Sequence, residues 1–204
     1  MSDRGPRVIG GTVGGIELRW PKTGATRPTT GKMREALFSM LEAADVSFDE
    51  VLDLYAGSGA LGIEALSRGD GHATFVESER RAIAVIRENL GRVGFTGRAT
   101  VVAGKVGRWT PPEDARYTLV LADPPYDRGT YDGGGAWGAI ETTVRGSLAE
   151  DTAVVVEHDA RQSPPSALAG LSLWRDRRHG AGAVAIYRAA VIEDGLPDGE
   201  GYDE

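Results

Sequence analysis

Cysteine is absent from the 204 residues, and the only histidines are His72, His158 and His179, which show no metal-ligand spacing. Disulfides, thiolate metal sites and thiol catalysis are therefore excluded, and we expect no metal cofactor. Long apolar runs are also missing: none approaches the roughly 20 residues that span a bilayer, and the first residues contain no apolar segment typical of a signal peptide. We therefore expect a cytoplasmic protein with no membrane partner.

Negative charge dominates overall, with a net charge of -7, but the basic residues are concentrated at one end. Residues 1–34 hold seven Lys/Arg against two acids, whereas residues 193–204 hold six acids and no base. The basic segment is a candidate surface for a polyanion such as an RNA backbone, although charge alone is equally compatible with a role in solubility. The cations expected to contact RNA are Arg7, Arg19, Lys22, Arg27, Lys32 and Arg34. Residues 191–204 are expected to form an acidic disordered tail.

The hydrophobic pattern predicts a small β unit followed by an α/β domain. Residues 7–20 predict two short strands around Gly14-Gly15, and the apolar spacing between Met33 and Ala44 predicts a helix. Strands are then predicted at 51–55, 72–77, 99–103, 117–122 and 152–157, with helices from about 60, at 79–92 and near 137–148. The closely spaced apolar runs 171–174 and 183–187 predict an antiparallel hairpin.

These elements predict a Rossmann-like, mostly parallel sheet with helices on both faces and an antiparallel hairpin at its end. We expect three parts: a basic RNA-binding extension (1–34), the catalytic α/β domain (35–190) and the acidic tail (191–204).

A glycine-rich loop between the first predicted strand and its helix suits a nucleotide cofactor. The match to G-x-G-x-x-G alone is weak and equally suits a dinucleotide. Asp53 favours S-adenosylmethionine, because a carboxylate this close to the glycines repels a pyrophosphate but attracts a cationic methionine end. Glu77 ends the next strand, where it can accept hydrogen bonds from ribose hydroxyls or cap the following helix. The expected cofactor contacts are Asp53, Tyr55, Ala56, Gly57, Ser58, Gly59, Gly62, Glu77, Gly104 and Lys105.

The tetrapeptide Asp123-Pro124-Pro125-Tyr126 follows a buried strand and predicts methylation of an exocyclic base amine. Such an amine is a poor nucleophile, because its lone pair is delocalised into the ring. The Asp123 carboxylate and the Pro124 carbonyl can accept its two N–H bonds and turn the lone pair toward a methyl donor. Pro125 confines Pro124 to an extended conformation, and Tyr126 offers a face for base stacking. The alternative is a rigid turn with an aromatic residue at the core edge.

The whole sequence from residue 7 to about 188 resembles the RsmD-type methyltransferases, which act on guanine N2 in bacterial 16S ribosomal RNA. The resemblance rests on Arg7-Val-Ile-Gly-Gly, Arg27-Pro-Thr-Thr, Arg34-Glu-Ala-Leu-Phe, Asp53-Leu-Tyr-Ala-Gly-Ser-Gly-Ala-Leu-Gly, Asp123-Pro-Pro-Tyr and Val156-Glu. It implies a class I S-adenosylmethionine-dependent methyltransferase, expected to be a monomer, that methylates guanine 966 within the small ribosomal subunit. One departure is Ala103-Gly104-Lys105, where related enzymes often place Asp or Asn against the adenine amino group.

Two other functions remain compatible with the sequence. An adenine-N6 methyltransferase of DNA or RNA uses the same Asp-Pro-Pro-Tyr chemistry, and a noncatalytic RNA-binding or ribosome assembly factor can keep the fold without turnover.

Overall fold

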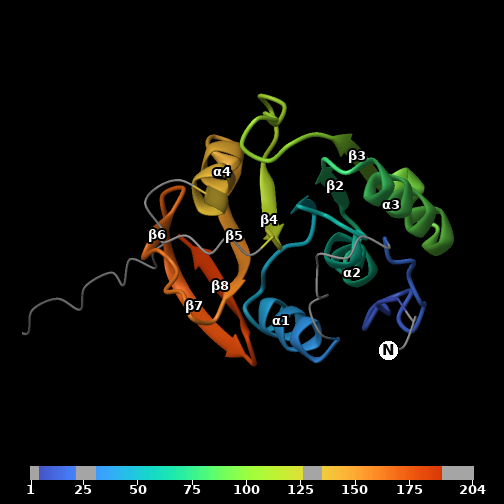
Figure 1. Ribbon diagram of the computed structural model, residues 1–204, viewed down its shortest axis with the longest axis horizontal. Helices are drawn as coiled ribbons and strands as arrows, with labels where there is room; N and C mark the ends of the chain where they lie inside the picture. The colour runs from blue at the N-terminus through green and yellow to red at the C-terminus, as the bar shows by residue number, and fades with distance from the viewer. Residues whose placement is uncertain (1–4, 22–30, 126–134, 190–204) are drawn as a thin grey trace, which may run out of the picture.

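The computed structural model describes residues 5–21, 31–125 and 135–189, which form a mixed sheet covered by helices on both faces (Figure 1). The strands are β1 (Glu50–Leu54), β2 (His72–Glu77), β3 (Ala99–Ala103), β4 (Tyr117–Ala122), β5 (Leu148–Asp159), β6 (Ala167–Leu168), β7 (Leu171–His179) and β8 (Gly182–Arg188). The helices are α1 (Gly31–Ala43), α2 (Ala60–Arg68), α3 (Arg80–Val93) and α4 (Gly135–Val144), with a short 3-10 helix η1 (Thr96–Arg98).

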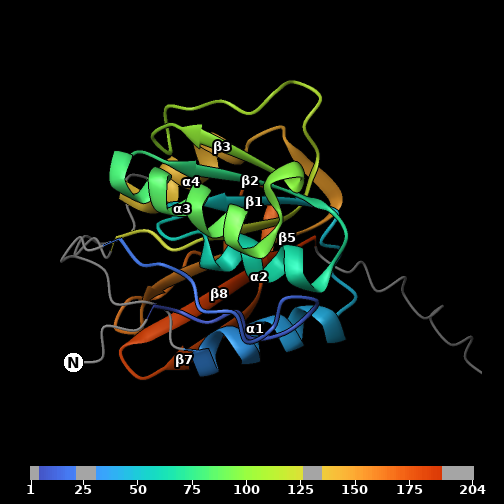
Figure 2. The same cartoon turned by 90° about the vertical axis from the view of Figure 1, so that its right-hand side faces the viewer.

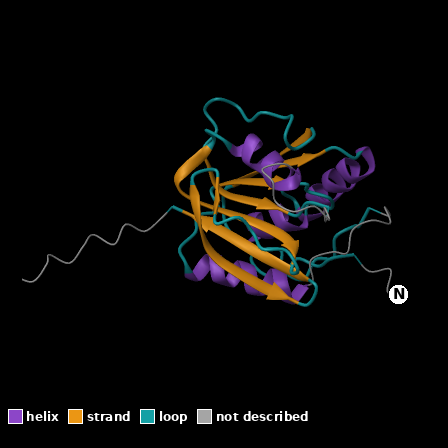
Figure 3. Ribbon diagram, turned by 60° about the vertical axis from the view of Figure 1, so that its left-hand side comes forward, coloured by secondary structure: helices purple, strands orange, loops and turns teal. Residues whose placement is uncertain are grey.

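The sheet order is β3-β2-β1-β4-β5-β8-β7-β6, and the first five of these strands are parallel. β8 pairs antiparallel with β5 and with β7, so the sheet ends in an antiparallel hairpin (Figure 3). The prediction of a Rossmann-like sheet with a terminal hairpin is therefore confirmed.

Each face of the sheet is covered by its own apolar cluster. Helices α1, α2 and α3 pack on one face, through buried residues such as Leu37, Leu66 and Ile86. Helix α4 packs on the other face, where Ile140 and Val144 join a second cluster (Figure 1). The strands are buried on both sides, which explains why β1 and β4 are almost uninterrupted apolar runs in the sequence.

Residues 5–21 differ from the predicted pair of strands. An isolated antiparallel bridge joins Arg7 and Glu17, and no strand is assigned within this segment. Its backbone still pairs across a turn, since Val8 N donates to Ile16 O (2.9 Å). Val8 and Leu18 belong to the same apolar cluster as α1–α3, so the segment packs against the helices rather than extending the sheet (Figure 2).

Two further differences concern element boundaries. The short strand β6 was not predicted, because two residues carry too little periodicity to be recognised. Helix α1 begins at Gly31, so the expected domain boundary after residue 34 falls inside this helix. Within the described part of the chain, no helix combines the length and apolarity needed to cross a membrane.

Candidate functional site

The carboxyl ends of β1, β2 and β4 bring three predicted site residues to one level of the sheet. Leu54 pairs with Val76 of β2 and with Ala122 of β4. The residues that follow these three are Tyr55, Glu77 and Asp123. From β1 the strand order runs through β2 to β3 on one side and through β4 to β5 on the other. This reversal is where parallel α/β sheets open a crevice for ligands.

Asp53 lies in the penultimate position of β1 and is only 1% exposed. Its Oδ2 accepts a hydrogen bond of 2.9 Å from Gly62 N in the first turn of α2. Burial raises the pKa of the Asp53 carboxyl well above its ordinary value, and the nearby charges of Asp123 and Glu77 raise this pKa further, against the Gly62 hydrogen bond. A ligand cation placed here would relieve this repulsion, whereas a pyrophosphate would increase it.

The glycine loop shows why glycine is needed at particular positions. Gly57 and Gly59 have φ values of 55° and 77°, in the left-handed region that glycine adopts without strain. Gly62 has a different role, because a Cβ there would collide with the Phe75 ring and lie 3.0 Å from Asp53 Oδ2. Gly62 therefore permits close packing between α2 and β1–β2. Tyr55 is a non-glycine residue at φ 57°, at the sharp turn where the chain leaves β1.

Glu77 is fixed by three backbone donors. Its Oε2 accepts from Gly57 N (2.9 Å), and its Oε1 accepts from Ser78 N (2.7 Å) and Glu79 N (2.8 Å). A carboxylate has about four acceptor positions, so about one remains for the ribose hydroxyls that the sequence led us to expect there. The cap of α3 is supplied instead by Glu79, whose side chain accepts from Arg81 N and Ala82 N.

Two adjoining cavities occupy this edge of the sheet. The first, which we call the Asp53 cavity, is lined by Pro6, Trp20, Arg34, Asp53, Tyr55, Ala56, Gly57, Ser58, Ala60, Leu61 and Asp123. The second, the Glu77 cavity, is lined by Trp20, Pro21, Tyr55, Gly57, Val76, Glu77, Ser78, Glu79, Ala82, Gly104, Lys105, Val106, Asp123 and Pro125. Trp20, Tyr55, Gly57 and Asp123 belong to both, so the two cavities form one continuous cleft.

The charged groups that line the cleft suit S-adenosylmethionine. Its Asp53 end is lined by the carboxylates of Asp53 and Asp123, which suit a cationic group, and at its Glu77 end a fixed carboxylate can accept from a ribose hydroxyl. Gly104 and Lys105, which follow β3 and are predicted cofactor contacts, also line the Glu77 end. The Gly104 amide donates to Glu77 O (2.9 Å), whereas the adenine amino group, itself a donor, would need an acceptor such as a backbone carbonyl.

The Asp-Pro-Pro-Tyr motif enters the same cleft. Asp123 is half-buried and lines both cavities, Pro124 is buried, and Pro125 is exposed at the Glu77 cavity. Tyr126 lies outside the described residues. The two carboxylates expected to serve donor and acceptor, Asp53 and Asp123, thus face one shared cavity.

The predicted RNA-binding cations are placed differently from one another. Arg7 is exposed, donates to Gly15 O (2.6 Å) and lies 3.8 Å from the Glu17 carboxylate. Arg19 is exposed and forms an ion pair with Glu88 at 3.0 Å.

Lys32 is exposed at the start of α1, whereas Lys22 and Arg27 lie outside the described residues. Arg34 is 3% exposed and lines the Asp53 cavity. Its side chain therefore does not reach a surface along which an RNA backbone could run, contrary to the expectation from its charge.

Long-range contacts add site residues that sequence reasoning missed. Trp20 forms a wall of both cavities. Asn89, fully buried in α3, accepts from Arg19 N (2.7 Å) and donates to Ser58 O (2.9 Å), so it holds the Trp20 segment and the glycine loop together. An asparagine within an apolar helical stripe was the one local signal that could have identified this tie.

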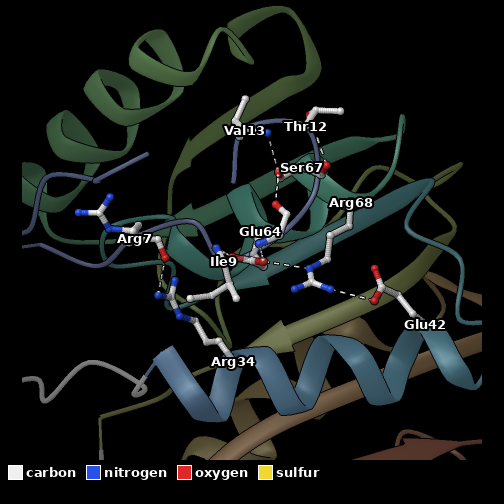
Figure 4. Close-up of polar contacts among 10 residues, drawn as sticks. Arg7, Ile9, Thr12, Val13, Arg34, Glu42, Glu64, Ser67 and Arg68 are labelled. Carbon is white, nitrogen blue, oxygen red and sulfur yellow. Dashed lines mark hydrogen bonds and ion pairs between the residues drawn. The ribbon is translucent and has the colours of Figure 1, made fainter. Parts of the chain in front are cut away.

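Glu64 of α2 fastens the N-terminal segment from a buried position. Its carboxylate accepts from Ile9 N (2.7 Å), Gly10 N (2.8 Å) and Arg68 Nε (2.9 Å) (Figure 4). Arg68 also contacts the Glu42 carboxylate at 2.8 Å. These contacts hold the segment that carries Trp20 against α2 and so complete the cleft.

Comparison with known proteins agrees with this architecture. A family model described as "Conserved hypothetical protein 95" matches residues 6–188. The Escherichia coli K12 protein named "Ribosomal RNA small subunit methyltransferase D" is 33% identical over 187 residues, which is 89% of each chain.

Solved structures show the same fold. A hypothetical protein from Thermus thermophilus is 27% identical, with a TM-score of 0.73 over 90% of this chain and 99% of that one. An RNA methyltransferase from Salinibacter ruber, solved with S-adenosyl-L-homocysteine, shares 18% identity and a TM-score of 0.56 over 84% of this chain and 100% of its own, which is a likeness of fold. With its family model matched across most of the sequence, the chain belongs to the family of RsmD-type methyltransferases.

Proposed function

We propose that this protein transfers a methyl group from S-adenosylmethionine to the exocyclic N2 amino group of guanine 966 in 16S rRNA of the small ribosomal subunit. The observation that carries the proposal is that Asp53 and Asp123 line one cavity, at the switch point of a methyltransferase sheet. The Asp53 carboxylate can attract the cationic end of the methyl donor, and the Asp123 carboxylate can hold the nitrogen that receives the methyl group.

S-adenosylmethionine supplies an electrophilic methyl group when bound. The chain's own part is to bind and orient. Asp53 is buried against α2 and provides negative charge near the donor's cationic end. The Asp123 carboxylate and the Pro124 carbonyl accept the two N–H bonds of the target amine, which aims the nitrogen lone pair at the cleft. The proton lost after transfer can pass to solvent, so Asp123 is needed for orientation and not as a strong base.

The choice of ribosomal RNA rests on the relatives and on the surface cations. The Escherichia coli relative is named for methylation of small-subunit ribosomal RNA. Arg7, Arg19 and Lys32 are exposed cations on the N-terminal segment and α1. They would contact phosphates and position the RNA without selecting guanine. A ribosomal RNA substrate also implies the cytoplasmic location that the sequence led us to expect.

Methyl transfer to undermethylated small subunits, followed by mass analysis of the digested nucleosides, tests the proposal. We expect N2-methylguanosine at position 966. N6-methyladenosine would identify the adenine-specific alternative, and the absence of turnover with intact subunits would favour a noncatalytic assembly factor.

The variant Asp123→Ala distinguishes the role of the Asp123 carboxylate from that of the Asp53 carboxylate. We expect methyl transfer to fall by about 100-fold or more, because the target amine loses its orienting acceptor, while S-adenosylhomocysteine affinity changes little. The matched variant Asp53→Ala should weaken the cofactor affinity instead. Equal loss of affinity in both variants would contradict this division of roles.

A further inference from the structure

Arg34 is a buried cation with unused hydrogen-bond donors. Its Nη2 donates to Arg7 O (2.9 Å), which leaves the guanidinium anchored beneath the N-terminal segment (Figure 4). Its Nε and Nη1 are buried and have no hydrogen-bond partner within the described part of the chain. An unsatisfied buried donor costs roughly 1–3 kcal/mol, and more when the group is charged. A bound group that accepted hydrogen bonds from both donors would remove this cost.

Among residues 5–21, 31–125 and 135–189, no acceptor forms a hydrogen bond with the Nε or Nη1 of Arg34. Burial lowers the pKa of Arg34, while the charge of Glu64 opposes this effect. The Glu64 carboxylate accepts from Ile9 N, Gly10 N and Arg68 Nε, and it makes no hydrogen bond to the buried Nε and Nη1 of Arg34. Glu64 therefore balances part of the charge of Arg34 at a distance without satisfying its free donors.

The free donors belong to a residue that lines the Asp53 cavity. Arg34 lines this cavity together with Asp53 and Asp123, so one cationic and two acidic residues surround it. A ligand end that carries both a carboxylate and a cation complements such a cavity. The amino acid end of S-adenosylmethionine has this character, with an α-carboxylate beside an α-ammonium and a sulfonium. A guanidinium is also the side chain best suited to carboxylate oxygens.

We propose that Arg34 binds the α-carboxylate of the cofactor's methionine end and thereby fixes the donor in the Asp53 cavity. The inference rests on the proposed cofactor. It assigns Arg34 to the cofactor, not to the RNA backbone. A phosphate of the target nucleotide offers the same anionic oxygens, so the test must distinguish the two sources.

Two ligands separate the amino acid end from the rest of the cofactor. S-adenosylhomocysteine carries the α-carboxylate, whereas 5′-deoxy-5′-methylthioadenosine keeps the adenosine and the sulfur but lacks the amino acid end. Calorimetric titration without RNA should show that Arg34→Gln weakens S-adenosylhomocysteine binding by about 10- to 100-fold. Binding of methylthioadenosine should stay within about twofold of wild type. Arg34→Lys, which keeps the charge, should lie between wild type and Arg34→Gln.

Arg68→Gln is the matched control. Arg68 is a second, nearly buried arginine beside Glu64, but it is not among the residues that line either cavity. Its replacement should lower the unfolding temperature without changing the ratio of the two affinities. Because each variant is compared with itself on two ligands, a partly misfolded protein would lose both affinities and could not imitate the selective loss.

Several results would overturn the assignment. Equal weakening of both ligands by Arg34→Gln would show a structural role. Unchanged ligand binding with a raised KM for small subunits would assign the guanidinium to an RNA phosphate. If wild-type protein bound neither ligand, the proposed cofactor and the role of Arg34 would fail together, whereas the other two outcomes would reject the role of Arg34 alone.

Discussion

Asp53 lowers the stability of the ligand-free protein at neutral pH, and the same carboxylate favours binding of a cationic ligand. The carboxylate is enclosed between β1 and α2, where Gly62 N donates a hydrogen bond to it. The apo protein therefore holds a carboxyl group whose ionised form is disfavoured by burial and by Asp123 and Glu77. A cationic ligand would stabilise the ionised form, so we expect cofactor binding and ionisation of Asp53 to be coupled.

Asp53→Asn should stabilise the apo protein at neutral pH. Below the ordinary Asp pKa of 3.8 the wild-type carboxyl is protonated in both folded and unfolded chains, so burial costs little. As the pH rises, the unfolded chain ionises first, and the wild-type free energy of unfolding falls until the raised pKa is passed. Each pKa unit between the two values is worth about 1.4 kcal/mol.

Urea unfolding of wild type and Asp53→Asn at pH 4 and pH 7.5 measures this effect. We expect the variant to gain stability relative to wild type between the two pH values, and to bind S-adenosylhomocysteine more weakly at pH 7.5. A constant difference across that range would show that Asp53 is not held against ionisation.

At the scale of elements, α2 joins the two halves of the site. In its first turn, Gly62 N donates to Asp53. Glu64, which is buried beneath the N-terminal segment (residues 5–21), accepts from Ile9 N. Ser67 contributes through its Oγ, which accepts from Val13 N (3.1 Å). Gly11 allows this approach, since a Cβ there would collide with the backbone carbonyl of Ser67.

Glu64→Ala should detach this segment. It removes the acceptor of two amides and leaves Arg68 with Glu42 as its remaining ion-pair partner among the described residues, so we expect a loss of about 3–5 kcal/mol in unfolding free energy, the usual range for breaking a buried ion pair. Faster hydrogen exchange at the amides of Ile9 and Gly10 would report the detachment.

Glu42→Ala is the control for that experiment. Glu42 contacts the same arginine from the surface, with its side chain 46% exposed, and its removal should cost about 0–1 kcal/mol. If Glu64→Ala does not fold, Glu64→Gln, which keeps one oxygen acceptor, should show an intermediate loss. Equal losses from positions 42 and 64 would refute the view that burial makes the contact important.

Periodicity and turn chemistry predicted most elements, because alternating β and α patterns and glycine turns are local signals. The ends of β1, β2 and β4 follow from the parallel topology, so Asp53, Glu77 and Asp123 could be placed at one edge from the sequence. Trp20 and Glu64 were not recognised from the sequence, and Asn89 offered only its place in an apolar helical stripe, because the contacts that place Glu64 and Asn89 span 31 to 70 residues. The burial of Arg34 was not predicted either, because charged residues are mostly exposed in folded proteins.

At the scale of the whole molecule, charge is distributed unevenly over a chain whose net charge is -7. The N-terminal segment and α1 carry exposed cations on one side of the sheet, while α4 covers the other side (Figure 1). Two of these cations are paired with acids, Arg7 with Glu17 and Arg19 with Glu88. Contacts with RNA would have to replace these exposed pairs, which are individually weak in water.

Binding of small subunits should therefore depend on salt through these residues. Each of Arg19→Ala and Lys32→Ala should reduce the slope of log K against log salt concentration by roughly 0.7–0.9, the value for one lost phosphate contact. Arg145→Ala removes an equally exposed cation that follows α4, where it pairs with Glu141, and should leave the slope unchanged. The same slope in all three variants would place the RNA on another surface.

The N-terminal segment also constrains the order in which the protein can assemble. The backbone of residues 9 and 10 is held by residue 64, and that of residue 19 by residue 89. Residues 9 and 10 therefore meet their partner only after synthesis has passed residue 64, and residue 19 only after it has passed residue 89. Strands β4 to β8 follow residue 89 in the chain, so both partners of the N-terminal segment are synthesised before the half of the sheet that carries Asp123, and the cleft is complete only once that later half has joined.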